Sequence, residues 1–308
     1  MKFKKILRGF KPRKSALLML SVLAIQLSGG MMNVIADTVA EYVNVSGDYV
    51  KVRTSTGIHD ASKLLVKVNG SEELAFCIEP DVIIPFGMNS GYVGKDRTDI
   101  SARAEQIATL WRTVTSDKWY YFVAQTMIWE QVNGIKVYGI DGLSDGDFQN
   151  IKSKINLAVD NYNRKPSFNG KKVTVKLGET VKLSDSNNSN LASFDKMRLN
   201  SANVNYSING NDLLISPKAD SKLDGNLRFA KSLAVGTSVV YQKSGSQTLM
   251  VAKITDPAFY NVKLKVIKTG KSQVQKIDAE TGKPMAGVKF KMTADGKDYE
   301  VTTNSKGI

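Results

Sequence analysis

The sequence is poor in the two side chains that most often bind metals or carry redox chemistry. Its 308 residues include one cysteine, Cys77, and one histidine, His59. One cysteine cannot close a disulfide within the chain, and this pair is too few for the three or four ligands of a zinc site. We therefore expect no disulfide, no metal and no cofactor. The single thiol must therefore have a role other than disulfide formation or metal binding.

Long apolar runs are also scarce. Residues 16–27 are mostly apolar and follow a segment with seven Lys or Arg and no acid. The run is shorter than the roughly 20 residues that a membrane-spanning helix needs. It ends near Val34-Ile35-Ala36, small or apolar residues typical of a signal-peptidase site. We predict a signal peptide at 1–36, a secreted chain at the cell surface or cell wall, and no membrane contact other than through this cleaved segment.

Basic residues outnumber acidic residues, but the excess positive charge is not arranged as in a nucleic-acid-binding surface. The formal net charge is +14, and half of it comes from residues 1–14. The remaining lysines are scattered among polar residues and form no basic stripe. We therefore expect no nucleic-acid partner.

Residues 40–165 are predicted to form an α+β domain, because strand-like alternation gives way to helical spacing. Strands are expected at 42–45 and 49–52, and an Asn69-Gly70 turn predicts a hairpin. Apolar residues at helical spacing predict three helices, near 104–114, 117–132 and 147–163. Ser116 is the expected N-cap of the second helix, and Asn133-Gly134 its end.

Residues 166–262 and 263–308 lack helical patterns. Short strands between turn clusters, including 238–241 and 248–252, predict a sandwich-like β domain over 166–262. A third unit over 263–308 stops within an expected hairpin, and so few strands do not make a stable β domain. We therefore expect an α+β domain followed by all-β stalk domains, the last of them truncated.

Two short segments of the first domain resemble the thioester domain of Gram-positive surface adhesins. They are Phe76-Cys77-Ile78-Glu79 and Ala124-Gln125-Thr126-Met127-Ile128-Trp129. The family has a cysteine late in a strand and a glutamine in a Thr-Gln-x-Ala-Ile-Trp-like helix. This sequence departs from that motif at Ala124 and Met127. The resemblance covers residues 42–166 and implies a Cys77–Gln125 thioester.

The last unit resembles the opening of a collagen-adhesin B-type, prealbumin-like stalk domain. The matching residues run from Lys276-Ile277-Asp278 through Gly282-Lys283-Pro284 to Phe290. The resemblance implies that Lys276 forms an intramolecular isopeptide bond with a partner beyond Ile308.

Thiol and carboxamide chemistry explains why a thioester needs these residues. A thiol and a glutamine carboxamide condense with loss of ammonia when a fold holds them together. Trp129 lies one helical turn after Gln125 and is expected to shield the bond, while Glu79 is a candidate for positioning an incoming amine. A lysine or other primary amine on a host or surface target then replaces the sulfur. The acyl group is used once, so we expect an adhesin of the cell wall or a pilus, and not an enzyme.

Two alternatives use the same residues differently. In a structural pilus or stalk subunit, Cys77 is an inert buried side chain. In a secreted cysteine hydrolase, Cys77 is the nucleophile and His59 its base. Loss of activity in His59→Ala would indicate the hydrolase, and unchanged surface binding in Cys77→Ala would indicate the structural subunit.

Overall fold

The computed structural model describes residues 38–97, 99–268, 273–294 and 296–308. These residues form two compact units, and each unit combines separate stretches of chain. Unit 1 holds residues 38–159 and 234–256, and unit 2 holds residues 160–233 and 257–308. The expected signal peptide lies outside the described residues. Within them, no helix has the length and apolar character needed to span a bilayer.

Unit 1 is built on an antiparallel sheet. Its spatial order is β1-β6-β14-β15-β4-β3-β2-β5, with β7 paired to β2. The strands are β1 (Thr38–Val39), β2 (Tyr42–Thr54), β3 (Gly57–Val68), β4 (Ser71–Cys77), β5 (Gly87–Asn89), β6 (Val93–Arg97), β7 (Val137–Ile140), β14 (Ser238–Gln242) and β15 (Leu249–Val251).

The hairpin predicted at Asn69-Gly70 is confirmed. Both residues have positive φ, at 50° and 77°, as a tight turn between twisted strands requires. This turn joins β3 to β4 and fixes the register that ends at Cys77. The two strands expected at 42–45 and 49–52 are instead one long strand, β2, whose pairing shifts between Val45 and Tyr49.

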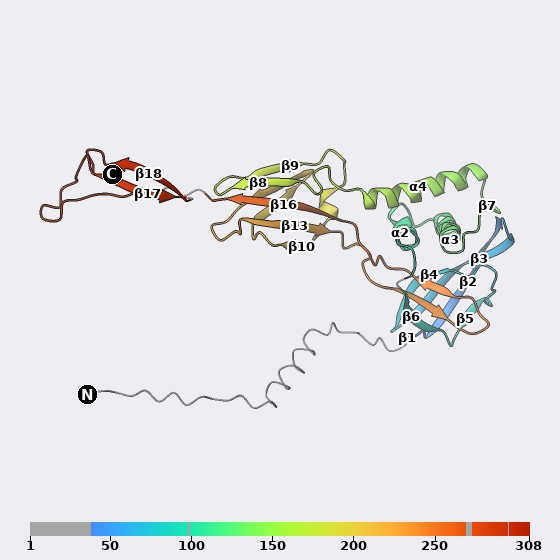
Figure 1. The fold of residues 1–308 in the computed structure, drawn as a ribbon. Helices are drawn as coiled ribbons and strands as arrows, with labels where there is room; N and C mark the ends of the chain where they lie inside the picture. The colour runs from blue at the N-terminus through green and yellow to red at the C-terminus, as the bar shows by residue number, and fades with distance from the viewer. Residues whose placement is uncertain (1–37, 98, 269–272, 295) are drawn as a thin grey trace, which may run out of the picture. The chain divides into compact units, whose positions relative to one another are not determined.

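Unit 1 also contains the three predicted helices, although β7, β14 and β15 come later in the chain than the first of them. The helices are α2 (Ala102–Leu110), α3 (Lys118–Val132) and α4 (Asp145–Asn163), and a short 3₁₀ helix, η1 (Trp111–Thr113), extends α2. The N-cap of α3 is Asp117 and not Ser116, because the Asp117 carboxylate accepts from the Trp119 N–H at 2.8 Å. α3 packs against β3, β4 and β7, above the sheet in Figure 1.

The strands expected at 238–241 and 248–252 do not belong to the β-rich region that precedes them. They form the hairpin β14–β15, which pairs with β6 and β4 in the sheet of unit 1. The expected domain boundaries of 40–165 and 166–262 are corrected accordingly. Alternating apolar residues identify a strand, but they do not specify which distant strand pairs with it.

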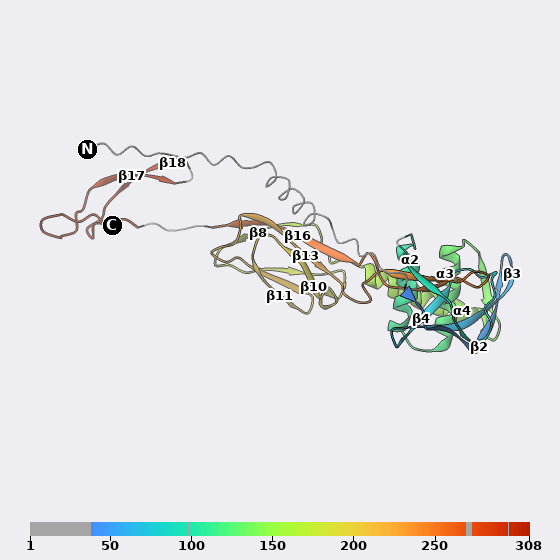
Figure 2. The ribbon, with the colours of Figure 1, turned by 90° about the horizontal axis from the view of Figure 1, so that it is seen from below.

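Unit 2 contains two sheets with a shared core, the sandwich-like arrangement expected from the sequence. One has the order β10-β13-β16-β8 and the other β11-β12-β9. Tyr206 of β11 meets Phe229 of β13 edge-on, with ring centroids 4.9 Å apart, so rings from both sheets are in contact. Figure 2 shows the strands of this unit from a second side. The elements are β8 (Lys172–Lys176), β9 (Val181–Ser184), η2 (Leu191–Ser193), β10 (Lys196–Asn200), β11 (Asn205–Asn209), β12 (Asp212–Ser216), β13 (Asp224–Ala230) and β16 (Phe259–Ile267).

The expected boundary between residues 262 and 263 is also corrected. It falls inside β16, which pairs along its length with β13 and β8. The final hairpin, β17 (Lys289–Ala294) with β18 (Lys297–Thr302), forms a two-stranded sheet of its own. The fold is therefore β-rich, with helices confined to one stretch of chain. A stalk domain beyond this hairpin stays a prediction.

Candidate functional site

Cys77 is the last residue of β4 and lies between two neighbouring strands. Cys77 pairs with Leu249 of β15, and the preceding residues of β4 pair with β3. The side chain is buried, with the whole residue 3% exposed. Its sulfur accepts from the Glu79 N–H at 3.3 Å. The strand end thus presents the thiol to the interior and not to solvent.

Gln125 reaches Cys77 from the middle of α3. The helix is buried along most of its length, and Gln125 itself is 0% exposed. Its Oε1 accepts from the Cys77 N–H at 2.8 Å, and its Nε2 donates to the Cys77 carbonyl oxygen at 2.8 Å. The structure therefore brings together the two residues predicted to react, although they lie far apart in the sequence.

Trp129 lies on the same face of α3 as Gln125. Its indole Nε1 donates to the Cys77 carbonyl oxygen at 3.0 Å, and the ring is 0% exposed. A buried indole N–H needs a partner, and this bond supplies it while placing the ring beside Cys77. The expected shielding position of Trp129 agrees with this geometry.

Burial controls the protonation of the thiol. Removal from water raises the pKa of Cys77 to about 12, while the Glu79 N–H and Trp129 pull it down more weakly. The carboxylates of Glu79 and Asp81 act in the same direction as burial. At neutral pH the unreacted cysteine is therefore a neutral thiol that keeps its proton.

Glu79 is half-buried and is committed to the β14–β15 hairpin. Its Oε2 accepts from the Thr248 N–H at 2.9 Å. The main chain beside it is held in the same way, because the Ile78 N–H donates to the Thr248 carbonyl at 3.1 Å. Glu79 fixes the strand end that carries Cys77, which is a different task from the expected positioning of an amine.

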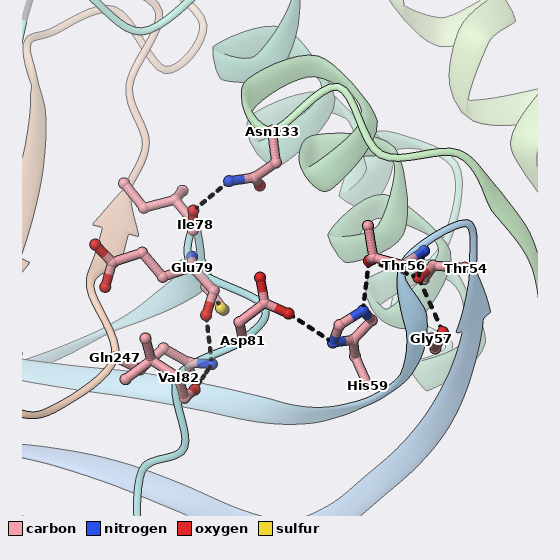
Figure 3. A network of polar contacts seen from close by, with 11 residues as sticks. Thr54, Thr56, Gly57, His59, Ile78, Glu79, Asp81, Val82, Asn133 and Gln247 are labelled. Carbon is pink, nitrogen blue, oxygen red and sulfur yellow. Dashed lines mark hydrogen bonds and ion pairs between the residues drawn. The ribbon is translucent and has the colours of Figure 1, made fainter.

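Two amide side chains that the sequence did not single out hold the segment after Cys77. Gln247 Nε2 donates to the Val82 carbonyl at 2.8 Å and to the Glu79 carbonyl at 3.3 Å. Asn133, the C-cap of α3, donates to the Ile78 carbonyl at 3.0 Å (Figure 3). The helix-stop motif that predicts Asn133 as a cap gives no signal of this second contact.

A buried carboxylate on α2 holds the two ends of the same hairpin. Glu105 is 2% exposed and accepts from the Ser238 hydroxyl at 2.7 Å. It also accepts from the Thr255 N–H at 2.9 Å and from the Thr255 hydroxyl at 2.8 Å. The helical pattern around residue 105 marks a helix, and nothing local in it indicates this long-range clamp.

Both ring nitrogens of His59 have partners other than Cys77. Nδ1 lies 3.3 Å from the Asp81 carboxylate, and Nε2 lies 2.9 Å from the Thr56 hydroxyl (Figure 3). The Thr54 hydroxyl donates to the Gly57 carbonyl, so the Thr56 hydroxyl gives its one proton to Thr54. His59 Nε2 is then a donor to Thr56, and this nitrogen has no lone pair free to act as a base.

Lys276, the expected isopeptide residue, is exposed. Its N–H donates to the Gly307 carbonyl at 2.8 Å, and its carbonyl accepts from the Met285 N–H at 2.9 Å. The backbone beside it forms an isolated bridge between Ile277 and Pro284. The described residues hold no group of three or more His, Cys, Asp or Glu arranged for a metal ion.

Comparison with solved structures identifies the fold around this site. The thioester domain of the Staphylococcus aureus TIE protein is similar at a TM-score of 0.57 and 25% identity, over 76% of this chain and 100% of that chain. No family model and no curated protein matches the sequence. The resemblance inferred from the Cys77 and Gln125 segments is therefore confirmed: the chain contains a region with the fold of a thioester domain.

Two other solved proteins align with lower scores. The Bacillus anthracis TIE protein aligns at a TM-score of 0.38 and 12% identity, over 87% of this chain and 56% of that chain. The thioester domain of the Enterococcus faecium TIE86 protein aligns at 0.36 and 13%, over 77% and 97%.

The extent of the S. aureus match corrects the expected extent of the resemblance. Residues 42–166 are 125 of 308, well under the 76% that the match covers. The match is too long for unit 1 alone and takes in residues of unit 2. The β-rich region that the sequence left without a family is thus partly accounted for by the same fold.

Proposed function

We propose that this chain is the target-binding part of a cell-surface adhesin, and that it attaches covalently through a thioester between Cys77 and Gln125. One observation carries the proposal. The Gln125 carboxamide is buried and held by two hydrogen bonds on the main chain of the single cysteine. The likeness to a thioester domain supports the same class of surface protein.

Formation of the bond needs no external base. Cys77 Sγ attacks Gln125 Cδ, and the charge that develops on Oε1 faces the Cys77 N–H at 2.8 Å, the distance of an oxyanion donor. The C–N bond then breaks. The thiol proton, retained because burial raises the pKa of Cys77, leaves with Nε2, so one ammonia is released.

Opening of the bond by a primary amine follows the reverse geometry. The amine nitrogen attacks Cδ, a C–N bond forms, and the C–S bond breaks. One amine proton passes to sulfur, which leaves Cys77 as a neutral thiol in a site that favours that form. The product is an amide between Gln125 and the target, and it is not turned over.

The hydrolase alternative is poorly supported by the partners of His59. A cysteine hydrolase needs a base in contact with its thiol. His59 is instead paired with Asp81 and Thr56, and the Cys77 sulfur accepts from a main-chain N–H. We therefore favour a single-use acyl group over a turnover enzyme.

Intact mass tests the proposal. Purified protein is expected to weigh one ammonia less than its sequence after any signal cleavage, and to gain one methylamine on treatment with that amine. Gln125→Ala and Cys77→Ala are both expected to show the full sequence mass and no methylamine uptake. Gln131→Ala, an exposed glutamine on the same helix, is the matched control and keeps the wild-type behaviour. Full sequence mass with a titratable thiol in the wild-type protein would refute the thioester.

We also propose that residues 263–308 open a stalk domain that separates the binding part from the cell wall or a pilus. Lys276 is the residue proposed to crosslink there, with a partner beyond Ile308. A longer chain that loses a further ammonia or water beyond the loss from the thioester, and that keeps this second loss in Lys276→Ala, would contradict that assignment.

A further inference from the structure

A pocket of about 430 Å³ lies beside the buried Cys77–Gln125 pair. Its walls are the start of β3 and residues 80–86, and Gln247 completes the lining. None of the lining residues is Lys or Arg, in a chain with a large excess of positive charge. The pocket is thus a local acidic and apolar site in a basic protein.

Two carboxylates line the pocket, and each forms one weak, exposed ion pair. Asp81 faces His59 Nδ1 at 3.3 Å, and its side chain is 77% exposed. Asp60 lies 3.5 Å from Lys51 Nζ, with both side chains more than half exposed. Exposed pairs of this kind contribute little, so an incoming cation can displace either partner. An ammonium group is the ligand that such a pair of carboxylates attracts.

Large apolar side chains at the rim are unusually exposed. Ile83 is 82% exposed, Ile58 66% and Phe86 63%. Phe86 also contacts Tyr49, with ring centroids 5.7 Å apart, and Tyr49 is 52% exposed. A cluster of exposed apolar residues around a polar hollow is typical of a surface that binds another protein.

The residues that line the pocket contact the side chains around Cys77. His59 lies edge-on to Trp129, with centroids 6.2 Å apart, and Trp129 donates to the Cys77 carbonyl. Residues 80–86 form the other wall, and Gln247 holds this segment through the Glu79 and Val82 carbonyl oxygens (Figure 3). Cys77 and Gln125 are themselves buried, and Asp81 of this wall lies close enough to Cys77 to raise the pKa of its thiol.

We propose that this pocket binds a lysine of the target that is flanked by apolar residues in an extended segment. Asp60 and Asp81 receive the ammonium group, and Ile83 and Phe86 contact the flanking side chains. This rests on the proposed function, because it names the substrate of the same site. The bound ammonium loses a proton to solvent before it attacks Gln125 Cδ as a neutral amine.

Binding without reaction tests the pocket separately from the thioester. The probe is the peptide Ala-Leu-Lys-Phe-Ala, carrying a fluorophore, and its anisotropy is measured with the full-chain Cys77→Ala protein. Asp60→Asn with Asp81→Asn is expected to weaken binding about tenfold, and acetylation of the peptide lysine to do the same. Phe86→Ser with Ile83→Ser is expected to weaken it at least fivefold. Asp96→Asn and Leu157→Ser, exposed residues outside the pocket, leave it unchanged.

Each other outcome has a defined meaning. Equal binding of the acetylated peptide, or no effect of the double asparagine variant, overturns the proposal. Equal binding of Ala-Ser-Lys-Ser-Ala or of spermidine overturns the apolar part of it. If Cys77→Ala is unfolded, wild-type protein treated with methylamine replaces it. A wild-type protein of full sequence mass that still binds the lysine peptide refutes the thioester and keeps the pocket.

Discussion

Cys77 in unit 1 and Lys231 in unit 2 are both buried titratable groups, and burial moves their pKa values in opposite directions. It raises the pKa of the Cys77 thiol to about 12 and lowers the pKa of the Lys231 amine to about 8. In both cases the neutral form is favoured, because charge is poorly solvated inside a protein. The difference lies in what surrounds each group.

Cys77 sits among polar groups that are paired with one another. Lys231, which is 4% exposed, lies over the rings of Phe194 and Tyr162 at 4.6 and 5.1 Å and donates to the Asn161 carbonyl at 3.4 Å. Ordered hydrogen bonds around a neutral thiol favour a defined reaction geometry. Both shifted pKa values make stability depend on pH, but the lysine does so from about pH 8 upward, nearer to neutral pH than the thiol.

Thiol reactivity is expected to show the largest effect. Protein carrying a free Cys77 thiol, either untreated or opened by methylamine, should react with iodoacetamide at pH 8 about 1,000-fold more slowly than the same protein unfolded in urea. Burial raises the pKa of the thiol from its ordinary value of about 9 to about 12, and each unit lowers the thiolate fraction about tenfold. The rate should rise with pH up to about 12. A fast, pH-independent rate in the folded protein would contradict the burial argument.

Removal of the Glu105 clamp is expected to destabilise unit 1 strongly. Glu105→Ala removes the acceptor of three hydrogen bonds, one of them from the buried Ser238 hydroxyl, which costs about 3 kcal/mol. All three tryptophans lie in residues 38–159, so tryptophan fluorescence during urea unfolding reports this unit alone. Asp48→Ala, which removes an exposed partner of Lys118, is the control and should change stability by less than about 1 kcal/mol.

Two buried tyrosines extend the comparison between the units. The Tyr121 hydroxyl donates to the Ala75 carbonyl at 2.8 Å and accepts from the Leu64 N–H at 3.1 Å. The Tyr260 hydroxyl is buried among rings and has no hydrogen-bond partner within the described residues. Tyr121→Phe is expected to cost about 2 kcal/mol, whereas Tyr260→Phe should be neutral or stabilising. Hydrogen exchange read separately in β4 and β16 measures the stability change of each variant, and equal losses of stability would contradict this difference between the two tyrosines.

The smallest effect is expected at Lys231. Its folded pKa of about 8 lies below the unfolded value, so the unfolded state binds more protons between these values. Stability of unit 2 should therefore rise with pH from about 8 to about 10.4, by about 3 kcal/mol in full and by about 1.3 kcal/mol between pH 7 and 9, and it should level off below about pH 8. Lys231→Met should remove this rise and stabilise the unit at pH 7. Hydrogen exchange of β13 at pH 7 and 9 measures the change, and an unaltered pH dependence would contradict it.

Local sequence patterns predicted much of unit 1. Helical spacing located α3 and α4 within two residues of their ends, and Asn69-Gly70 located the β3–β4 turn. The helices and the turn depend on residues close in sequence, where period, capping and turn chemistry act directly. That Cys77 and Gln125 meet was implied instead by the resemblance of the segments around them to thioester domains.

Apart from the N-cap of α3, which is Asp117 and not Ser116, the main errors concern long-range pairing. The β14–β15 hairpin was assigned to the wrong sheet, and a boundary was placed inside β16. The roles of Glu79 and Gln247 were missed for the same reason, because both act on the hairpin or the loop that it contacts. The sequence of a strand shows which of its faces is buried, but it does not specify which distant strand pairs with it.

The sequence by itself determined that this chain has one thiol, one matching carboxamide and a tryptophan one turn beyond it. Only the tertiary structure decided that the carboxamide lies on the main chain of Cys77, and that a hairpin from residues 234–256 closes the site. It also placed an acidic and apolar pocket beside the pair. The physical reason is that reactivity depends on enclosure, and enclosure is produced by segments far apart in the chain.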